Sequence, residues 1–260
     1  GMDIYNGERS VLEDTPEQRQ KVLEAAWEKG GWSILMAYND ILVNEKGNKL
    51  VAEFVRSKIR EIVKDPETAE KLVPDHYYGT KRAIIDTNYF ETYNRDNVSL
   101  VDVKQAPIEE ITSTGIRTAD SDYELDTIVF ATGFDGMTGS LFKIDITGRN
   151  GVTLKEKWAN GEKTQTYLGL TTVGFPNLFM LTGPESPSVL GNMPAAIEQH
   201  VEWVMDCIDH LHKNDVEVFE AMPEAEEKWS QHCRELADAT LYTKTESWYT
   251  GANIDTKARG

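Results

Sequence analysis

The sequence has few cysteines and no long apolar run. Its 260 residues include only Cys207 and Cys233, neither of which lies in a CxxC motif, so the chain lacks a disulfide framework. No stretch approaches the about 18 consecutive apolar residues that indicate a transmembrane helix. The first residues, Gly1-Met2-Asp3, show no signal-peptide regions, and Gly1 before Met2 is typical of a cloning remnant. We therefore expect a cytoplasmic protein.

Positive charge is also scarce. The chain has 27 Lys and Arg against 44 Asp and Glu, so its formal net charge is -17. Phosphate-rich partners need clustered cations, so this balance argues against a nucleic-acid partner and against docking on an anionic membrane. It still allows an anionic cofactor, which needs only one or two well-placed cations. The length suits one large domain or two small ones, with enough residues to bury a core.

Several motifs of cofactor and catalytic sites are missing. The sequence contains no GxGxxG, no GxxxxGKS/T, no HExxH and no GxSxG. The glycines at 133, 136 and 139 have the wrong spacing for a pyrophosphate-binding turn. Candidate metal ligands fall on or near one predicted helix, where successive side chains diverge, so we expect no metal site. They are His200, Cys207, His210 and His212.

The first third of the chain predicts helices. Thr15-Pro16-Glu17-Gln18 is a capping-box start, and Gly30-Gly31 ends that helix. A second helix is expected from about Asn48 to Val63. A third begins at Asp65-Pro66-Glu67 and stops before Pro74.

Apolar runs of β type begin after residue 75. A continuous apolar run at 127–132 predicts a strand buried on both faces, as in a parallel sheet of an α/β protein, and 178–181 predicts another. Four shorter runs lie at 83–85, 98–101, 108–112 and 115–118.

Two further helices are expected in the second half. Asn192 can cap the first of them, with Pro194 in its first turn. Its apolar stripe is Ile197, Val201, Val204, Ile208 and Leu211. A last helix starts near Pro223, and we expect three of its side chains to face inward: Trp229, Cys233 and Leu236.

Three parts of the sequence carry a chemical signal. Gly79-Thr80-Lys81-Arg82 places adjacent cations before a predicted strand, as an anion site or as a solvated pair. The segment 129–135 ends a strand in small residues, which either admits a ligand to the backbone or makes a tight turn. The segment 183–193 leads into a helix N-terminus with free N–H groups. It pairs with 247–253, an aromatic pair before a glycine turn, which packing alone also explains.

Together these segments resemble the C-terminal portion of a Baeyer–Villiger monooxygenase, a flavoprotein like the phenylacetone, cyclohexanone and steroid monooxygenases. The resemblance runs from Thr15 to Ala252, and its most specific pieces are GTKR, FATGFD, TYLGL, GFPNLFMLTGP, IEQHVEW and TLYTKTESWYTGAN. It implies an α/β fold, an incomplete Rossmann-type FAD/NADP-binding architecture with an N-terminal helical subdomain. The implied domains are a helical subdomain at 2–75, the remainder of an NADP-binding domain at 76–130, and the C-terminal part of an FAD-binding domain at 131–260.

The resemblance also implies a reaction. In that family FAD and NADPH serve together, and a flavin C4a-peroxide formed with oxygen attacks a ketone to give an ester or lactone. Steroid and aryl ketones are among the expected substrates. The family uses cofactor and substrate partners only, with no nucleic acid and no membrane.

Site residues follow from the same resemblance. Arg82 matches the arginine that stabilises the anionic flavin peroxide, and Lys81 matches the basic residue near the 2′-phosphate of the nicotinamide cofactor. Trp248 matches a nicotinamide-cofactor contact. The remaining matches form two groups. Val189, Leu190 and Met193 correspond to the ketone pocket, with the Met193 N–H near the flavin pyrimidine carbonyl, while Thr132, Gly133 and Asp135 correspond to the motif between the cofactor domains.

The sequence departs from the family in what it lacks. It has neither of the two GxGxxG motifs nor the FxGxxxHxxxW fingerprint. We therefore expect a fragment that is inactive alone and binds neither cofactor tightly, with exposed sheet edges that favour self-association. Two alternatives stay open. One is a non-catalytic α/β interaction domain that complements a separate N-terminal half. The other is a flavin enzyme that oxidises nitrogen or another heteroatom, although GTKR and SWYTGAN together are not expected there.

Overall fold

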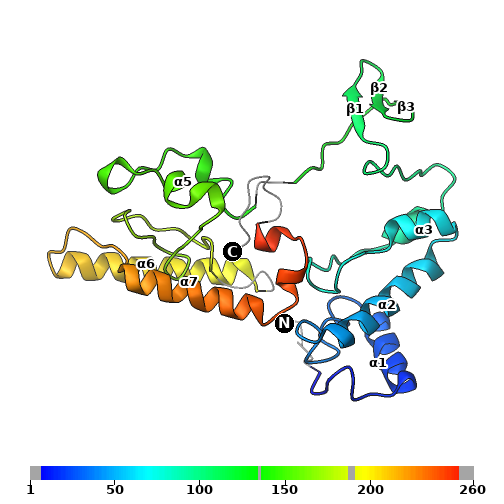
Figure 1. Ribbon diagram of the computed structural model, residues 1–260, viewed down its shortest axis with the longest axis horizontal. Coiled ribbons are helices and arrows are strands. Elements are labelled where there is room, and N and C mark those ends of the chain that lie inside the picture. Colours follow the sequence, from blue (N-terminus) through cyan, green and yellow to red (C-terminus); the bar gives the residue numbers. More distant parts are fainter. Residues whose placement is uncertain (1–6, 134–135, 187–190, 252–260) are drawn as a thin grey trace. The chain divides into compact units, whose positions relative to one another are not determined.

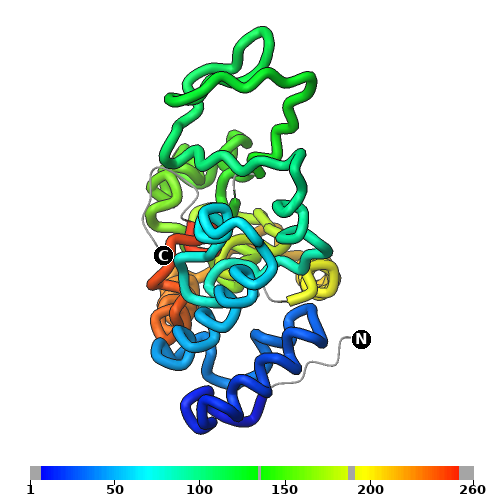
Figure 2. Tube along the Cα trace, turned by 90° about the vertical axis from the view of Figure 1, so that its right-hand side faces the viewer, coloured from blue at the N-terminus to red at the C-terminus, as the bar shows by residue number. Residues whose placement is uncertain are grey.

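The computed structural model describes residues 7–133, 136–186 and 191–251 (Figure 1). The chain divides into two compact units, an N-terminal unit at Gly1–Gly133 and a C-terminal unit at Phe134–Gly260. Figure 2 follows the Cα trace through both.

Four helices open the N-terminal unit. They are α1 (Pro16–Lys29), α2 (Glu45–Ile62), α3 (Pro66–Leu72) and the single turn α4 (Tyr89–Thr92). The capping box at Thr15 and Gln18 is present, and Gly30 ends α1 with a φ of 72°, as the sequence predicted. Helix α2 begins earlier than expected, because the side chain of Asn44 caps it by accepting from the Gly47 N–H at 3.1 Å.

These helices enclose the core of the N-terminal unit. Each helix contributes an apolar stripe, and the α1–α2 connection adds apolar side chains of its own. The rings of Trp27 in α1 and Phe54 in α2 meet edge to face, 6.3 Å apart. Its buried residues include Val11, Leu23, Ile34, Leu35, Ile41, Val51 and Phe54. A separate cluster joins α2 to α3 and consists of Ile59, Val63 and Ala69.

A small antiparallel sheet follows in the same unit. Strands β1 (Ile108–Ile111), β2 (Gly115–Thr118) and β3 (Asp122–Glu124) pair in that order. The expected runs at 108–112 and 115–118 are therefore strands. The Arg117 guanidinium in β2 joins its neighbours by ion pairs to Glu110 at 2.7 Å and Asp122 at 2.9 Å.

The other expected strands are wrong for this chain. Among the described residues, 83–85, 98–101, 127–132 and 178–181 belong to no strand. The run at 127–132 was predicted to be buried, yet Val129 is 81% and Phe130 is 71% exposed. A central strand exists only when neighbouring strands accept and donate along its whole length. The described residues supply no such neighbours at 127–130.

The C-terminal unit holds α5 (Leu154–Lys157), α6 (Met193–Lys213) and α7 (Pro223–Asp238). Its core is Leu154, Trp158, Phe175 and Met180. Figures 1 and 2 together show loop segments between α6 (yellow) and α7 (orange) rather than direct packing of the two helices. Short 3₁₀ turns complete the unit at Leu141–Lys143, Arg149–Gly151, Ala159–Gly161, Tyr242–Lys244 (η4) and Trp248–Thr250 (η5).

Two expectations about these helices need correction. Asn192 stands at the N-cap of α6, but its side chain makes no capping hydrogen bond. Leu236 of α7 is 58% exposed rather than inward. The buried residues of α6 and α7 are instead polar, namely His200, Glu226 and Ser230, since these helices face loops whose backbone groups need partners. No helix in the described part of the chain is long and apolar enough to cross a membrane.

Candidate functional site

The turn at Gly79–Arg82 rests on helix α2. The buried Asn48 amide donates to the carbonyls of Ile41 at 2.8 Å and Tyr78 at 2.9 Å, and its oxygen accepts from the Tyr78 N–H at 2.9 Å. Gly79 follows with a φ of 82°, and a Cβ there would lie 2.6 Å from Leu35 Cδ1. Only glycine fits this conformation and this space. The backbone entering the turn is therefore fixed.

Two cations leave this fixed turn. Thr80 is fully buried, and its hydroxyl donates to the Tyr77 carbonyl at 2.7 Å. The next side chains, Lys81 and Arg82, are exposed. The Arg82 guanidinium carbon lies 5.5 Å from the centroid of the Trp32 ring, within cation–π range. The arrangement offers positive charge from a rigid support.

The pKa of His76 is sensitive to the charges around this turn. Burial lowers the pKa of His76, and the positive charge of Lys81 lowers it further. Arg56 lies in the same corner and donates from Nε to the Pro74 carbonyl at 2.9 Å. The Asp75 carboxylate, 3.7 Å from His76 Nδ1, acts in the opposite sense. The exposed cations Lys81 and Arg82 make the turn a candidate for an anionic group.

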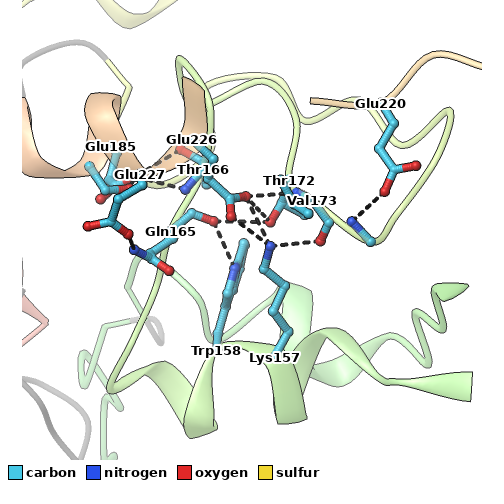
Figure 3. Close-up of polar contacts among 12 residues, drawn as sticks. Lys157, Trp158, Gln165, Thr166, Thr172, Val173, Glu185, Glu220, Glu226 and Glu227 are labelled. Carbon is cyan, nitrogen blue, oxygen red and sulfur yellow. Dashed lines mark hydrogen bonds and ion pairs between the residues drawn. The ribbon is translucent and has the colours of Figure 1, made fainter. Parts of the chain in front are cut away.

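The loop before α6 is held by a half-buried carboxylate. Glu185 Oε2 accepts from the Thr166 N–H at 2.8 Å and from the Ser230 hydroxyl of α7 at 2.7 Å (Figure 3). The Glu185 carbonyl also accepts from the indole of Trp229 at 3.1 Å. Burial raises the pKa of Glu185, and these hydrogen bonds oppose the rise. The carboxylate joins the loop to α7.

A buried carboxylate of α7 holds the neighbouring segment at Thr172 and Val173. Glu226 of α7 is 6% exposed and forms an ion pair with Lys157 of α5 at 2.8 Å. It also accepts from the Thr172 hydroxyl and the Val173 N–H, each at 2.8 Å (Figure 3). Charged pairs at this depth persist when such bonds satisfy their remaining oxygens. Sequence reasoning missed Glu226, because it stands in the acidic stretch Pro223-Glu-Ala-Glu-Glu-Lys228, which is typical of a solvated first turn.

Helix α6 is tied to the same loop by His200. Its Nδ1 accepts from the Thr182 N–H at 2.9 Å, and the residue is 4% exposed. Burial lowers the pKa of His200. Because Nδ1 accepts, the ring carries its proton on Nε2.

The N-terminus of α6 presents backbone N–H groups. Met193 is its first residue, and Pro194 has no N–H. Among the described atoms, the N–H groups of Met193 and Ala195 find no acceptor. The helix dipole adds partial positive charge at this end. The geometry suits a carbonyl or anionic acceptor.

Trp248 and Tyr249 lie side by side in the sequence before Gly251 but differ in exposure. Ser247 is buried, and its hydroxyl accepts from the Tyr249 N–H at 3.3 Å. Tyr249 packs edge to face against Tyr242, with ring centroids 5.8 Å apart. Trp248 is 41% exposed and so keeps one ring surface open to solvent.

The predicted site residues fall into separate places. Lys81 and Arg82 share the turn on α2, and Thr132 and Gly133 are exposed in an extended stretch at the end of the same unit. Met193 and Trp248 belong to the C-terminal unit. Asp135, Val189 and Leu190 lie outside the described residues. Within the described residues, no group of His, Cys, Asp and Glu is placed to hold a metal ion.

Comparison with known proteins gives close relatives. No family model matches the chain. A Baeyer-Villiger monooxygenase of Pseudooceanicola batsensis is 46% identical over 246 residues, covering 94% of this chain and 44% of that protein. The phenazine N-monooxygenase PhzNO1 of Lysobacter antibioticus is 43% identical over 249 residues, covering 95% of this chain and 45% of that protein. The chain therefore spans less than half the length of these curated relatives.

Solved structures agree. OTEMO in complex with FAD and NADP gives a TM-score of 0.89 at 41% identity, covering 94% of this chain and 46% of that chain. The cyclohexanone monooxygenase from Rhodococcus sp. Phi1 bound to NADP+ gives a TM-score of 0.90 at 42% identity, covering 96% of this chain and 47% of that chain. The resemblance that the short motifs predicted is confirmed.

Proposed function

This chain is homologous to Baeyer–Villiger monooxygenases over 94% of its length, and from that premise we propose that it is part of an FAD- and NADPH-dependent enzyme that converts ketones to esters or lactones. The homology is the single observation that carries the proposal. The cationic turn at Lys81 and Arg82 supports it, because oxygen insertion beside a carbonyl builds negative charge on oxygen.

Arg82 is the residue to which we assign the central role. A guanidinium does not lose its proton at any working pH, so it offers a permanent positive charge. A cation that is already oriented stabilises developing oxyanion charge without reorganising at the moment of reaction. The buried support of the turn by Asn48 and Thr80 favours such an orientation.

The chain's residues suit parts of two cofactors. The solved relative OTEMO holds FAD and NADP, and when bound these groups supply oxygen activation and reducing electrons. We assign Lys81 to the 2′-phosphate, because it is an exposed cation next to the exposed cation Arg82. We assign the Met193 N–H, at the N-terminus of α6, to a flavin carbonyl and the exposed Trp248 to the nicotinamide cofactor.

The remaining assignments follow the resemblance. Val189 and Leu190, with Met193, line the ketone pocket, and Thr132, Gly133 and Asp135 connect the cofactor domains. We propose that 2–75 is a helical subdomain, that 76–130 belongs to a Rossmann-type NADP-binding domain, and that 131–260 belongs to an FAD-binding domain. The division of the chain into compact units at Gly1–Gly133 and Phe134–Gly260 supports the boundary between the last two of these domains.

The experiment is a domain exchange. This chain replaces the matching region of the Pseudooceanicola batsensis relative, and the purified chimera receives FAD, NADPH, cyclohexanone and isotopically labelled O2. We expect a lactone that carries one labelled oxygen atom. NADPH oxidation without labelled lactone, under conditions where the unaltered relative forms it, would contradict the proposal.

The 260-residue chain is tested beside the chimera. Because the sequence contains no GxGxxG phosphate turn, we predict that the chain alone retains little flavin. Robust turnover of NADPH by the chain alone would contradict that expectation.

Nitrogen oxidation is a second candidate, favoured by one comparison. The phenazine N-monooxygenase is 43% identical to this chain, so overall identity does not separate ketone from nitrogen chemistry. The same chimera is therefore offered a phenazine in place of the ketone. Formation of the N-oxide without any lactone would favour this second candidate.

A non-catalytic interaction domain is the third candidate. The exposed apolar side chains of Val129 and Phe130 favour docking with another polypeptide. In that case, mixing the chain with the separately produced remainder of a relative yields a stable complex and restores flavin binding. Absence of a complex on size-exclusion chromatography would count against it.

A further inference from the structure

A half-buried glutamate lies in the loop that leads into α6. The Glu185 carboxylate accepts from the Thr166 N–H at 2.8 Å and from the Ser230 hydroxyl of α7 at 2.7 Å (Figure 3). The chain continues from this loop to Met193, the first residue of α6. We propose that Glu185 is a positioning residue for the N-terminus of α6, because its carboxylate fixes the loop from which the helix starts.

The backbone of Glu185 indicates that its side chain selects the loop conformation. Its φ is 61°, in the left-handed region, which is unfavourable for a residue with a Cβ and neutral for glycine. Such a conformation persists where surrounding contacts over-determine it. Two hydrogen bonds to one carboxylate are contacts of this kind, since bonds to a charged acceptor are about twice as strong as neutral ones.

The loop rests on the turn of the TYLGL motif. A Cβ at Gly169 would lie 2.3 Å from Ser186 Cβ, so the loop meets this turn at a distance that only glycine allows. The Gly169 carbonyl accepts from the Gly183 N–H at 3.0 Å, and the Thr166 hydroxyl donates to the Pro184 carbonyl at 2.8 Å. The turn therefore supports the loop along its length, and the glutamate carboxylate links both to α7.

The same loop is bonded directly to α6. The Thr182 N–H donates to His200 Nδ1 at 2.9 Å, about two turns after Met193 in the helix. His200 is buried, so water does not compete for this bond. The loop is thus joined to α7 through Glu185 and to α6 through His200, and a displaced loop would no longer hold the start of α6 in place.

The catalytic meaning of this positioning rests on the proposed function. There the Met193 N–H is assigned to a flavin carbonyl and the Met193 side chain to the ketone pocket, so both depend on where α6 begins. A misplacement of about 1 Å can lower a rate about 100-fold. Glu185 is assigned no contact with cofactor or substrate and acts through the loop and His200.

Amide hydrogen exchange of the 260-residue chain, resolved to single residues by nuclear magnetic resonance, tests the positioning without any activity. One reporter is the Thr182 N–H, bonded to His200, and the other is the Ala196 N–H, which bonds to the Asn192 carbonyl at 3.1 Å in the first turn of α6. In Glu185→Ala we expect both to exchange about 10- to 100-fold faster, because bonds to a charged acceptor are lost. Glu185→Gln keeps an oxygen acceptor and should restore most of the protection.

Glu227→Ala is the matched control. Glu227 is an exposed carboxylate of the same helix that accepts from the Gln165 side chain at 2.7 Å, beside Thr166 in the sequence. Its removal leaves the bonds of the loop in place, so both reporters should keep their exchange rates. Ser230→Ala removes one donor to the Glu185 carboxylate and changes no loop residue. It should accelerate the same two amides, which keeps the test decisive if Glu185→Ala does not fold.

Two results would overturn the proposal. One is a pair of reporters that exchange at unaltered rates in Glu185→Ala, or in Ser230→Ala if the first variant does not fold. The other is an equal acceleration of the Leu154 N–H, which bonds to the Ile146 carbonyl in the core at 2.9 Å, since the destabilisation would then be general. Glu185→Gly removes the carboxylate and relieves the positive φ, so faster exchange there also follows from the lost bonds and not from strain.

The chimera tests the consequence for the reaction. In it, Glu185→Ala should lower kcat/KM for cyclohexanone about 10- to 100-fold through a higher KM for the ketone, with the KM for NADPH nearly constant. A merely structural role would reduce the amount of active enzyme and change neither KM, which would contradict the proposal. If the exchange rates change as expected while the chimera forms no lactone, the proposed function fails and the positioning of α6 by Glu185 stands.

Discussion

At the scale of single residues, burial decides protonation. His200 is neutral because it has little water and because Nδ1 must accept the Thr182 N–H. Two effects oppose each other at Glu185. Burial raises its pKa, and the hydrogen bonds from Ser230 and Thr166 lower it. These two side chains tie the loop before α6 to other elements, His200 to α6 and Glu185 to α7.

We predict that mild acid lowers the stability of the chain by protonating His200. Burial holds the folded-state pKa of His200 below its unfolded value of about 6.5, so its contribution to stability is complete above that pH. It is lost as pH falls from there toward the folded-state pKa, because the unfolded chain binds the proton more readily. Thermal unfolding of the chain between neutral and mildly acidic pH should show this loss. His200→Asn, whose amide oxygen accepts without titrating, should reduce the slope. The exposed His212→Asn control should leave it unchanged, and parallel curves for all three would contradict the prediction.

Arg82→Ala should separate the two half-reactions of the chimera. We expect flavin reduction by NADPH to persist and lactone formation to fall about 100- to 1,000-fold, the usual effect of removing an oxyanion-stabilising donor. Stopped-flow reduction and product analysis measure the two steps. Equal loss in both would identify Arg82 as a structural residue instead.

In the chimera, Lys81→Ala should reduce the preference for NADPH over NADH. A charge-assisted contact with the 2′-phosphate exists for NADPH and not for NADH. We therefore expect the KM for NADPH to rise about tenfold and the KM for NADH to stay nearly constant. Lys155→Ala, which removes another exposed lysine, is the matched control. An unchanged ratio of the two constants would remove Lys81 from the cofactor site.

At the scale of elements, one buried amide connects α2 to the cationic turn. Asn48 is fully buried, and its side chain bonds to backbone groups of Ile41 and Tyr78. Removing it leaves those groups buried without partners, which costs more than the bonds contribute net. The attachment of the cationic turn to α2 therefore depends on the Asn48 amide.

Asn48→Ala should lower the free energy of unfolding by about 2–4 kcal/mol. Urea denaturation followed by circular dichroism measures it. Asn39→Ala, which breaks an exposed bond to the Glu8 carbonyl, should cost less than about 1 kcal/mol. Equal effects of the two changes would show that the Asn48 bonds do not stabilise the turn.

At the scale of the molecule, the chain exposes residues whose composition is that of a core. Val129 and Phe130 stand in a run without strand partners in the described part of the chain, and Ile84 and Ile85 are exposed as well. Contiguous exposed apolar side chains on an unpaired extended segment favour association.

We predict that the 260-residue chain self-associates through this run. Light scattering coupled to size-exclusion chromatography should show a mass that rises with concentration. Val129→Lys should reduce the rise, because a charge in the apolar run opposes pairing. Val43→Lys, at another exposed valine outside the run, should not. A monomer at every concentration would contradict the prediction.

The ends of α1 and the cationic turn were readable from the residues alone. Thr15, Gln18 and Gly30 act within one or two turns of backbone, so their effect does not depend on the rest of the fold. The cationic pair at Lys81 and Arg82 was found for a similar reason, since adjacent cations are rare in an acidic chain. The motifs also predicted the relatives that the comparisons confirm.

Strand pairing and buried polar contacts depended on tertiary structure. The run at 127–132 has the composition of a strand, but a strand requires hydrogen-bond partners that lie elsewhere in sequence, and the described residues do not supply them. The partners of Glu226, Glu185 and Trp32 are likewise dozens of residues away. Helices are predictable from the sequence because their hydrogen bonds join residues only a few positions apart. Contacts between distant segments arise only when the chain has folded.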